Sequence, residues 1–278
     1  MNRARAFHQV DVFTVVPLKG NPVAVVLDGS GLDTAAMQQF ANWTNLSETT
    51  FVFSPSDPAA DYAVRIFTPK SELPFAGHPT LGTAYAVMSA GLANARDGML
   101  VQQCAVGLVE ISVGQGSLSF CLPPATITPA PQPEVLTAAL GGALVAPPQI
   151  VNVGPRWVIA ELPTPADVRA LIPDLSALAA YDHAHGVTGQ TIFAVEANGD
   201  VVVRSFAAGD GIAEDPVCGS GNGAVAAYRR WAGDGEADYI ASQGREIGRD
   251  GIISLCYAAG KIHVGGACVT VVEGTVRL

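Results

Sequence analysis

The sequence predicts an α+β protein made of two similar halves. Segments rich in β-branched residues, typical of strands, surround only a few segments with helical spacing of apolar residues. This favours α+β over a regular βαβ series. Motifs of the first half recur in the second: Arg65 matches Arg204, an offset of 139 residues, and His78 matches Ser220, an offset of 142. A chain of 278 residues has room for two such units.

Each half is expected to follow the same order: a strand, an outer helix, further strands, and a helix introduced by glycine. In the first half we expect strands over 23–27, 50–53 and 63–67 and helices over 32–43 and 79–90. In the second half we expect strands over 157–161, 191–195 and 201–206 and helices over 167–171 and 222–232. Asp33 or Thr34 is the expected N-cap of the first helix.

A proline-rich segment separates the two halves. Five prolines lie between Leu122 and Glu134, and proline at this density cannot form a central strand or continue a helix. Residues 123–134 are therefore expected to be a semi-rigid crossover. The N-terminal half then covers residues 1–122 and the C-terminal half residues 135–278, with a last strand that could return to the first half.

Charge and composition exclude several classes of protein. The chain has 25 acidic and 15 basic residues, a net charge of −10, the opposite of what nucleic acids or anionic membranes attract. No apolar run has the length of a membrane span, and the N-terminus lacks the apolar core of an export signal. The five cysteines are scattered, which fits a reducing cytoplasm better than a disulfide framework or a zinc–thiolate site.

The repeated glycine loops are the first candidate binding site. Gly77 and Gly219 each come just before a predicted helix, where unpaired N–H groups and the helix dipole attract anions. Glycine also lets a ligand approach the backbone closely. Two such ends facing one cleft would hold a small carboxylate between the halves. Each glycine alone could simply serve a tight turn, but the recurrence, with His78 and Ser220 at the next position, favours a shared site.

Glu48 is the candidate general acid or base. It precedes the apolar strand, and a partly desolvated carboxylate at that place has its pKa raised toward a useful range. A solvated or helix-capping carboxylate explains the position at least as well. His78 and Asp215 are further candidates, because a histidine beside a carboxylate can orient or relay a proton. His78 could equally cap its helix, and Asp215 could form a turn before Pro216.

Two other motifs give weaker alternatives. Gly219–Ala224 fits G-x-G-x-x-A, a relaxed dinucleotide fingerprint, but it follows a polar turn over 213–216 instead of a buried parallel strand. His183 and His185 could form a metal pair, but no carboxylate or cysteine lies at ligand spacing. We therefore expect a surface loop over 181–189 and neither a cofactor nor a metal.

Three ordered motifs together resemble the PhzF-like family of phenazine biosynthesis. They are N-x-S-E-T at 45–49, F-A-G-H-P-T-L-G at 75–82 and E-D-P-V-C-G-S-G-N at 214–222, preceded by V-D-V-F-T at 10–14 and G-N-P at 20–22. The resemblance spans nearly the whole chain. It implies the fold of the diaminopimelate epimerases and proline racemases: two pseudo-symmetric halves, each a curled, mostly antiparallel sheet around a central helix, with the active site between them.

The resemblance also implies residue roles. Glu48 matches the family's glutamate, which moves a proton within the substrate without cofactor or metal. His78 and Asp215 match polar residues that position substrate and proton. The residues that match the loops receiving the substrate carboxylate are Gly77, Gly219 and Ser220.

Residues and resemblance together predict a cofactor-independent isomerase of a small carboxylate-bearing metabolite, with Glu48 as acid and base. Dihydro-hydroxyanthranilate is the best-known substrate of the family. The related epimerases use two opposed cysteines, one in each loop, whereas here Ala76 stands in the first slot and Cys218 in the second. Two alternatives stay open: an amino-acid epimerase using Glu48 and Cys218, and a non-catalytic protein that binds a small acid. We expect a cytoplasmic protein whose partner is its substrate, with a homodimer, common in the family, as a candidate assembly.

Overall fold

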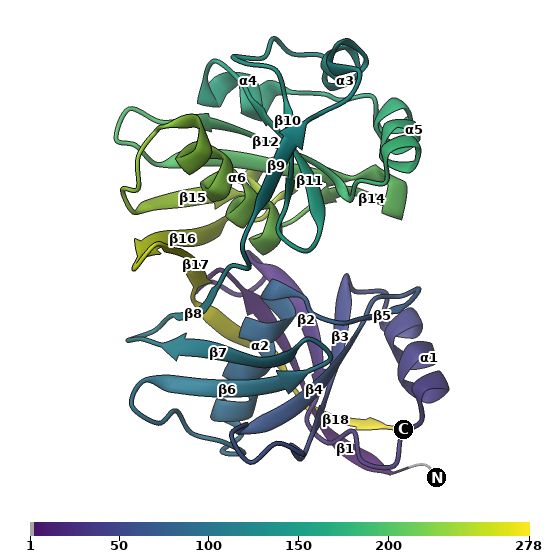
Figure 1. Ribbon diagram of the computed structural model, residues 1–278. Coiled ribbons are helices and arrows are strands. Elements are labelled where there is room, and N and C mark those ends of the chain that lie inside the picture. Colours follow the sequence, from purple (N-terminus) through teal and green to yellow (C-terminus); the bar gives the residue numbers. More distant parts are fainter. Residues whose placement is uncertain (1–2) are drawn as a thin grey trace. The chain divides into compact units, whose positions relative to one another are not determined.

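The computed structural model describes residues 3–278 and divides them into two compact units (Figure 1). Unit 1 comprises the residues up to Phe120 together with Gly265–Leu278, and unit 2 comprises Cys121–Val264. Each unit is a mixed, mostly antiparallel sheet with helices packed on it. The predicted α+β fold class is confirmed.

Unit 1 is a sheet with one inner and one outer helix. Its strands are β1 (Ala4–Val12), β2 (Asn21–Val26), β3 (Glu48–Phe53), β4 (Tyr62–Phe67), β5 (Glu72–Leu73), β6 (Met99–Cys104), β7 (Gly107–Val113), β8 (Leu118–Cys121) and β18 (Cys268–Arg277). They pair in the order β18–β1–β2–β3–β4, after which β4 receives β5 at one end and β6 at the other, followed by β7 and β8. The pairs β2–β3 and β4–β6 are parallel. Parallel neighbours need a crossover, and α1 (Thr34–Thr44) and α2 (Gly77–Ser89) provide them.

Unit 2 repeats this plan. Its strands are β9 (Thr126–Pro129), β10 (Gln149–Asn152), β11 (Arg156–Glu161), β12 (Gly189–Val195), β13 (Val201–Ala207), β14 (Ile212–Asp215), β15 (Tyr239–Gln243), β16 (Gly251–Ala258) and β17 (Lys261–Gly266). Its helices are α3 (Pro133–Leu140), α4 (Pro165–Ala170), α5 (Leu175–His185) and α6 (Gly219–Ala232), with short 3₁₀ turns η1 (Ala208–Asp210) and η2 (Arg245–Ile247). The parallel pairs are β11–β12, across α4 and α5, and β13–β15, across α6.

The two sheets correspond strand for strand from β1 and β10 onward. β9 pairs antiparallel with β10 as β18, the last strand of the chain, pairs antiparallel with β1. The proline-rich segment 123–134 therefore contains a strand, with Pro129 at its end, and also the start of α3 at Pro133. Proline is tolerated at both places, because a strand end and the first turn of a helix do not require a backbone N–H donor.

The central helices α2 and α6 are buried over most of their length. Small residues let them approach the strands closely: a Cβ at Gly82 would lie 2.4 Å from the Val23 side chain, and one at Gly223 would lie 2.6 Å from that of Leu122. A helix built from small and apolar residues around its whole circumference is typical of such a buried position. α2 packs against β1, β2 and β3, and α6 packs against β10, β11 and β12.

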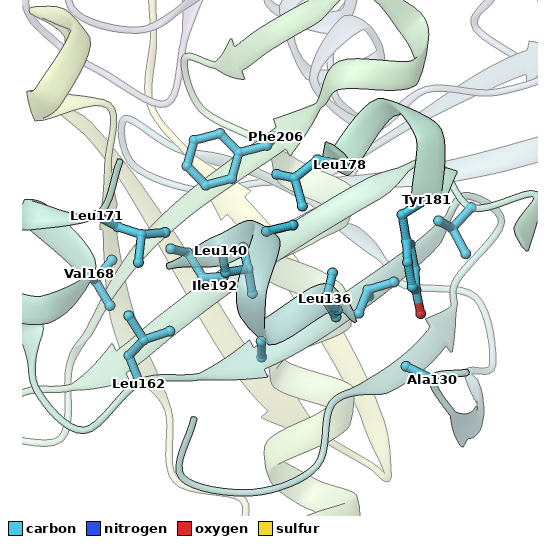
Figure 2. Close-up of a cluster of buried hydrophobic side chains, with 14 of the residues drawn as sticks. Ala130, Leu136, Leu140, Leu162, Val168, Leu171, Leu178, Tyr181, Ile192 and Phe206 are labelled. Atoms are coloured by element: carbon cyan, nitrogen blue, oxygen red, sulfur yellow. The ribbon is translucent and has the colours of Figure 1, made fainter. Parts of the chain in front are cut away.

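Outer helices cover a second apolar layer in each unit. In unit 1, α1 contributes Met37 and Phe40, which pack with Phe51 and Phe67 of the sheet. In unit 2, α3, α4 and α5 bury a larger cluster against β12 and β13, drawn in Figure 2. Its labelled members are Ala130, Leu136, Leu140, Leu162, Val168, Leu171, Leu178, Tyr181, Ile192 and Phe206. Each sheet is thus filled on both faces, which fixes the strand register and hence the positions of the loops at its ends.

The predicted elements are present, with shifts at their boundaries. Asp33 is the N-cap of α1, and its side chain accepts the Ala36 N–H. Gly77 and Gly219 are the first residues of α2 and α6 and do not lie in the loops before them. The expected surface loop over 181–189 is wrong for its first part, because α5 extends through His185 to a left-handed cap at Gly186. Across residues 3–278, the helices are too short or too polar to cross a bilayer.

Candidate active site

Glu48 and His78 form a close polar pair in unit 1. Glu48 is the first residue of β3, His78 lies in the first turn of α2, and Oε2 of Glu48 is 3.2 Å from Nε2 of His78. Both side chains are largely buried, at 16% and 8% exposure. Asn45, the left-handed C-cap of α1, turns the chain toward β3. Two residues that lie 30 positions apart in the sequence are thereby brought into contact.

The His78 imidazole is neutral near physiological pH. Burial lowers its pKa to about 3, although a hydrogen bond to the backbone of Pro22 opposes this shift. Proline has no N–H, so this bond runs from the imidazole to the Pro22 carbonyl. The predicted helix-capping alternative for His78 is wrong, because the N-cap of α2 is Ala76 and His78 lies inside the helix.

Asp215 lies in unit 2 at the end of β14, where its backbone turns toward α6. Its Oδ1 accepts the Val217 N–H at 3.0 Å. Burial raises the pKa of this carboxyl to about 6, while the Val217 N–H and the Cys218 thiol oppose the shift and the neighbouring Glu214 adds to it. The predicted polar turn over 213–216 is thus partly a short strand that pairs antiparallel with β13.

Cys218 is the N-cap of α6. Its Sγ accepts the Gly221 N–H at 3.2 Å and lies 3.6 Å from Oγ of Ser220. Ser220 in turn accepts a hydrogen bond from Nε1 of the buried Trp157 at 3.0 Å. Indole is only a donor, so this contact leaves the Ser220 hydroxyl proton available to another acceptor. Asp215, Cys218 and Ser220 therefore form one polar group at the start of α6.

The two glycines of the repeated loops, Gly77 and Gly219, differ in how they are packed. A Cβ at Gly77 would lie 2.7 Å from the ring of Phe120. Packing within unit 1 therefore requires glycine at this position, whatever its role toward a ligand. Gly219 is buried in the first turn of α6, directly after Cys218. The expected anion site shared by Gly77 and Gly219 stays a prediction.

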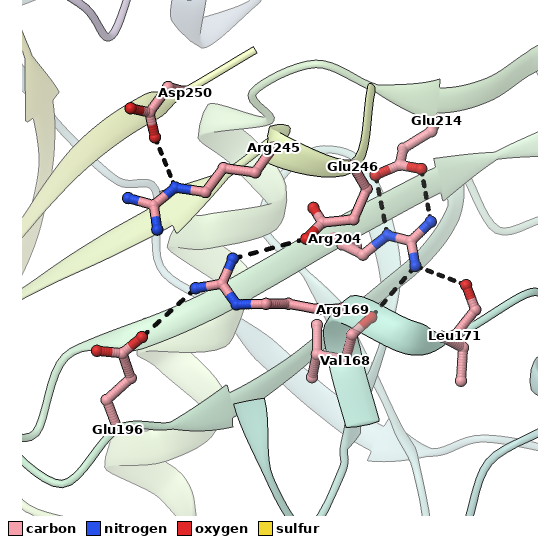
Figure 3. A network of polar contacts seen from close by, with 9 residues as sticks. All are labelled: Val168, Arg169, Leu171, Glu196, Arg204, Glu214, Arg245, Glu246 and Asp250. Carbon is pink, nitrogen blue, oxygen red and sulfur yellow. Dashed lines mark hydrogen bonds and ion pairs between the residues drawn. The ribbon is translucent and has the colours of Figure 1, made fainter. Parts of the chain in front are cut away.

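A buried ion pair anchors the strand that carries Asp215. Arg204 donates from Nε and NH2 to the two oxygens of Glu214 at 3.0 and 2.8 Å, and from NH1 to the carbonyls of Val168 and Leu171 at 3.2 and 2.6 Å (Figure 3). The guanidinium thereby links β13, β14 and the end of α4. Figure 3 also shows Arg169 between Glu196 and Glu246, and Arg245 with Asp250.

Unit 1 contains the counterpart of this arginine fork, in which one guanidinium donates to both oxygens of one glutamate. Arg65 donates to both oxygens of Glu72 at 2.7 and 2.6 Å. In both units the guanidinium also lies over the phenylalanine ring two residues on, at 5.2 and 5.1 Å. The sequence repeat contained this signal, since both the arginines and the glutamates recur. Sequence reasoning missed the pairing itself and also missed Trp157 and Gln243, for which no motif gave a signal.

The remaining histidine and nucleotide motifs do not join either polar group. His183 and His185 lie on α5, where His183 contacts the Gly209 carbonyl at 3.1 Å and His185 packs on the Tyr181 ring at 4.4 Å between centroids. Within residues 3–278, no three His, Cys, Asp or Glu side chains gather in a way that could hold a metal ion. The Gly219–Ala224 motif follows the short antiparallel strand β14 instead of a buried parallel one.

Comparison with known proteins gives one consistent family. The model of the phenazine biosynthesis-like protein family, PhzC-PhzF, matches residues 10–274. The chain is 37% identical over 291 residues to antisense-enhancing sequence 1 of Schizosaccharomyces pombe, with 97% of each chain covered. It is 36% identical over 281 residues to trans-2,3-dihydro-3-hydroxyanthranilate isomerase of Pseudomonas chlororaphis, with 97% of this chain and 98% of the relative covered.

A solved structure agrees with the sequence comparisons. The PhzF-family phenazine biosynthesis protein of Bacillus anthracis has a TM-score of 0.88 to this chain at 25% identity, with 99% of this chain and 100% of that chain covered. The likeness in each comparison extends over nearly the full length of both partners.

Proposed function

This chain belongs to the phenazine biosynthesis-like protein family, and on that premise we propose that it is a PhzF-like isomerase of a small cyclic carboxylate. The substrate class is represented by trans-2,3-dihydro-3-hydroxyanthranilate, the compound named for one relative. The observation that carries the proposal is the contact of Glu48 with a neutral His78 at 3.2 Å.

The proposed step moves one proton between two carbons of the substrate. The Glu48 carboxylate takes the proton from the first carbon, and the electron pair of that C–H bond enters the conjugated system. The shifted double bond leaves electron density at a second carbon, to which Glu48 returns the proton on the same face. No atom or electron is gained or lost, so neither an oxidant nor a cofactor is needed for the step.

A neutral histidine helps Glu48 to hold the proton between the two halves of this step. When Glu48 holds the proton, its O–H can donate to Nε2 of His78. Burial lowers the pKa of the imidazole to about 3, so the proton stays on the carboxyl and does not pass to the ring. His78 is thus a positioning partner, and Glu48 is the group that exchanges the proton with carbon.

The polar group at the start of α6 in unit 2 is proposed to bind the polar groups of a small acid. The Ser220 hydroxyl, oriented by the Trp157 N–H, can donate to a substrate carboxylate together with the first N–H groups of α6. Glycine at Gly77 and Gly219 adds no side chain between the N–H groups of either helix start and a ligand. Asp215, whose pKa is raised to about 6, is suited to accept a hydrogen bond from a substrate amine or hydroxyl.

The test is turnover of trans-2,3-dihydro-3-hydroxyanthranilate by chelator-treated, nucleotide-free protein, followed by NMR in H₂O and in D₂O. We expect an isomer of unchanged mass in H₂O, with one C–H position moved and the remaining stereocentre retained. Absence of turnover with this acid, while the control isomerase of Pseudomonas chlororaphis is active, would remove this substrate from the proposal.

One observation favours a second candidate, an epimerase. Cys218 keeps a thiol at the N-cap of α6, where a helix start favours the thiolate. In that case Glu48 and Cys218 would serve as opposed bases, and an optically pure amino acid would racemise at its α-carbon. Loss of optical rotation without a new double-bond position would decide for this candidate.

A further inference from the structure

The loop that carries Asp215 and Cys218 is held at both ends by one side chain, Gln243. Nε2 of Gln243 donates to the Asp215 carbonyl at 3.0 Å, and Oε1 accepts the Cys218 N–H at 3.1 Å. Gln243 is the last residue of β15 and is 1% exposed. Its amide therefore spans the four-residue loop, pairing with a backbone acceptor at one end and a backbone donor at the other.

Asn222 extends the contact into α6. Its Nδ2 donates to Oε1 of Gln243 at 2.8 Å and to the Cys218 carbonyl at 2.9 Å. The start of α6, the loop and β15 thus share one buried hydrogen-bond network. Each of these bonds pairs polar groups in the interior, so the loss of Gln243 would disturb several of them at once.

Two glycines beyond Gln243 fit the middle of the loop. Gly244 has φ +93°, and a Cβ there would lie 2.3 Å from the Pro216 carbonyl oxygen. A Cβ at Gly251, the first residue of β16, would lie 2.3 Å from the Val217 side chain. The corner between β15 and β16 therefore contacts the loop along its whole length.

We propose that Gln243 is a positioning residue for the reaction: its amide sets the place of the Asp215 carboxyl and the Cys218 cap relative to α6. Only an amide side chain combines an acceptor and a donor at this reach. Glutamate accepts but does not donate when ionised, and methionine fills the volume without either. The proposal rests on the isomerase function for its kinetic consequence, but its structural consequence can be measured without a substrate.

The experiment compares Gln243→Met, Gln243→Glu and the matched control Gln190→Met. Gln190 is a fully buried glutamine of the same unit whose Nε2 bonds Asp182 on α5 and not the loop. Amide hydrogen exchange of peptides covering 215–222 is measured by mass spectrometry, and kcat/KM for trans-2,3-dihydro-3-hydroxyanthranilate is measured well below the Tm of each variant.

We expect Gln243→Met to speed exchange of the loop amides and to lower kcat/KM, each by about tenfold, the effect of losing a buried hydrogen bond. Gln190→Met should lower Tm about as much as Gln243→Met does, but it should change neither the exchange of the loop amides nor kcat/KM. Gln243→Glu keeps the accepted bonds, but when ionised it places a buried carboxylate against the Asp215 carbonyl, so its effect on loop exchange should be at least as large near neutral pH. The two variants remove the donated bond in different ways, so either one supplies the test if the other does not fold.

Unchanged loop exchange in both Gln243 variants, or changes equal to those of Gln190→Met, would overturn the proposal. If the wild-type protein does not turn over this substrate, the exchange measurement still decides the role of Gln243, and only the proposed function fails. Turnover by the wild type with an unaffected Gln243→Met variant would instead leave the function standing and remove Gln243 from it.

Discussion

Ala76 and Cys218 occupy the same position in the two units: each is the N-cap of a central helix, and they differ by a thiol group. At α6 the thiol accepts the Gly221 N–H, whereas α2 has no side-chain cap. The thiol of Cys218 also contacts the Asp215 carboxyl and opposes the upward shift of its pKa. These contacts account for a cysteine at this position without a role as a base.

We therefore predict that Cys218→Ser keeps most of the isomerase activity. Serine retains an N-cap acceptor and a donor toward Asp215, but it is not acidic enough to act as a thiolate base. Cys218→Ala should lose the cap, about 1 kcal/mol of stability, and retain activity at temperatures below its Tm. Both variants are assayed by turnover and by product stereochemistry.

A Cys218→Ser variant as inactive as one lacking Glu48 would contradict this prediction. It would favour the two-base epimerase, in which the thiolate removes or returns the α-proton. Alkylation of Cys218 does not separate the two cases, because a bulky adduct at the N-cap would block a ligand in either.

Replacement of Glu48 should abolish chemistry and leave folding intact. Glu48→Gln keeps the size of the side chain and can still donate a hydrogen bond to Nε2 of His78. Because the variant has no exchangeable carboxyl proton, kcat should fall at least about a hundredfold, the usual scale of general acid–base catalysis. Tm should barely change.

The matched control is Glu161→Gln. Glu161 is another partly buried glutamate whose pKa is raised by burial, but it lies at the end of β11 near Tyr228 and Asp234. Its replacement should leave kcat unchanged. An active Glu48→Gln variant would mean that another group transfers the proton.

The local pattern of the sequence was enough to predict most elements, whereas contacts between distant residues were not predictable from it. The duplicated motifs indicated two related units because a repeated motif folds into a repeated element, as at Arg65 and Arg204. The contact of Glu48 with His78 depends on the parallel pairing of β2 with β3 and on how α2 packs on them. Neither the strand pairing nor the helix packing produces a periodic pattern in a single sequence. The same holds for the contacts of Gln243, which is a polar residue within a strand.

Acid should destabilise the native state through His78. Its pKa is about 3 in the folded protein and near 6.5 in an unfolded chain. Between these values the unfolded chain binds a proton that the native state does not, so stability falls as pH drops from about 6.5 toward 3. We predict that His78→Gln reduces the loss of stability between pH 7 and pH 4, measured by urea unfolding.

Asp215 contributes in the opposite direction, since its raised pKa makes the native state bind a proton more strongly between about pH 4 and pH 6. The comparison of His78→Gln with wild type cancels this contribution, because both chains contain Asp215. His183→Gln serves as the control, since its exposed ring contacts the Gly209 carbonyl at the surface. An equal loss of stability on acidification in wild type and His78→Gln would show that His78 is not buried as a neutral ring.

The two arginine–glutamate pairs should differ in how much they contribute to thermal stability. Arg204 and Glu214 are buried, at 8% and 9% exposure, whereas Arg65 and Glu72 are 33% and 35% exposed. Arg204→Lys cannot donate to both Glu214 oxygens and to two carbonyls together. Breaking a buried pair costs up to about 3–5 kcal/mol, whereas the exposed fork contributes about 0–1 kcal/mol. Arg204→Lys should therefore lower Tm clearly, and Arg65→Lys should hardly change it.

The same substitution should change the pH dependence of catalysis. Burial is the main cause of the raised pKa of Asp215; the Val217 N–H and the Cys218 thiol oppose it, and the charge of Glu214 adds to it. Because lysine neutralises Glu214 less completely than the arginine fork does, the pKa of Asp215 should rise above about 6 in Arg204→Lys. In a plot of kcat/KM against pH, the acid limb is the rise of activity from low pH. This limb should move to higher pH in Arg204→Lys and stay in place in Arg65→Lys. If both variants shift the limb equally, or neither does, the ionisation of Asp215 is not what the limb reports, and the fork acts on stability alone.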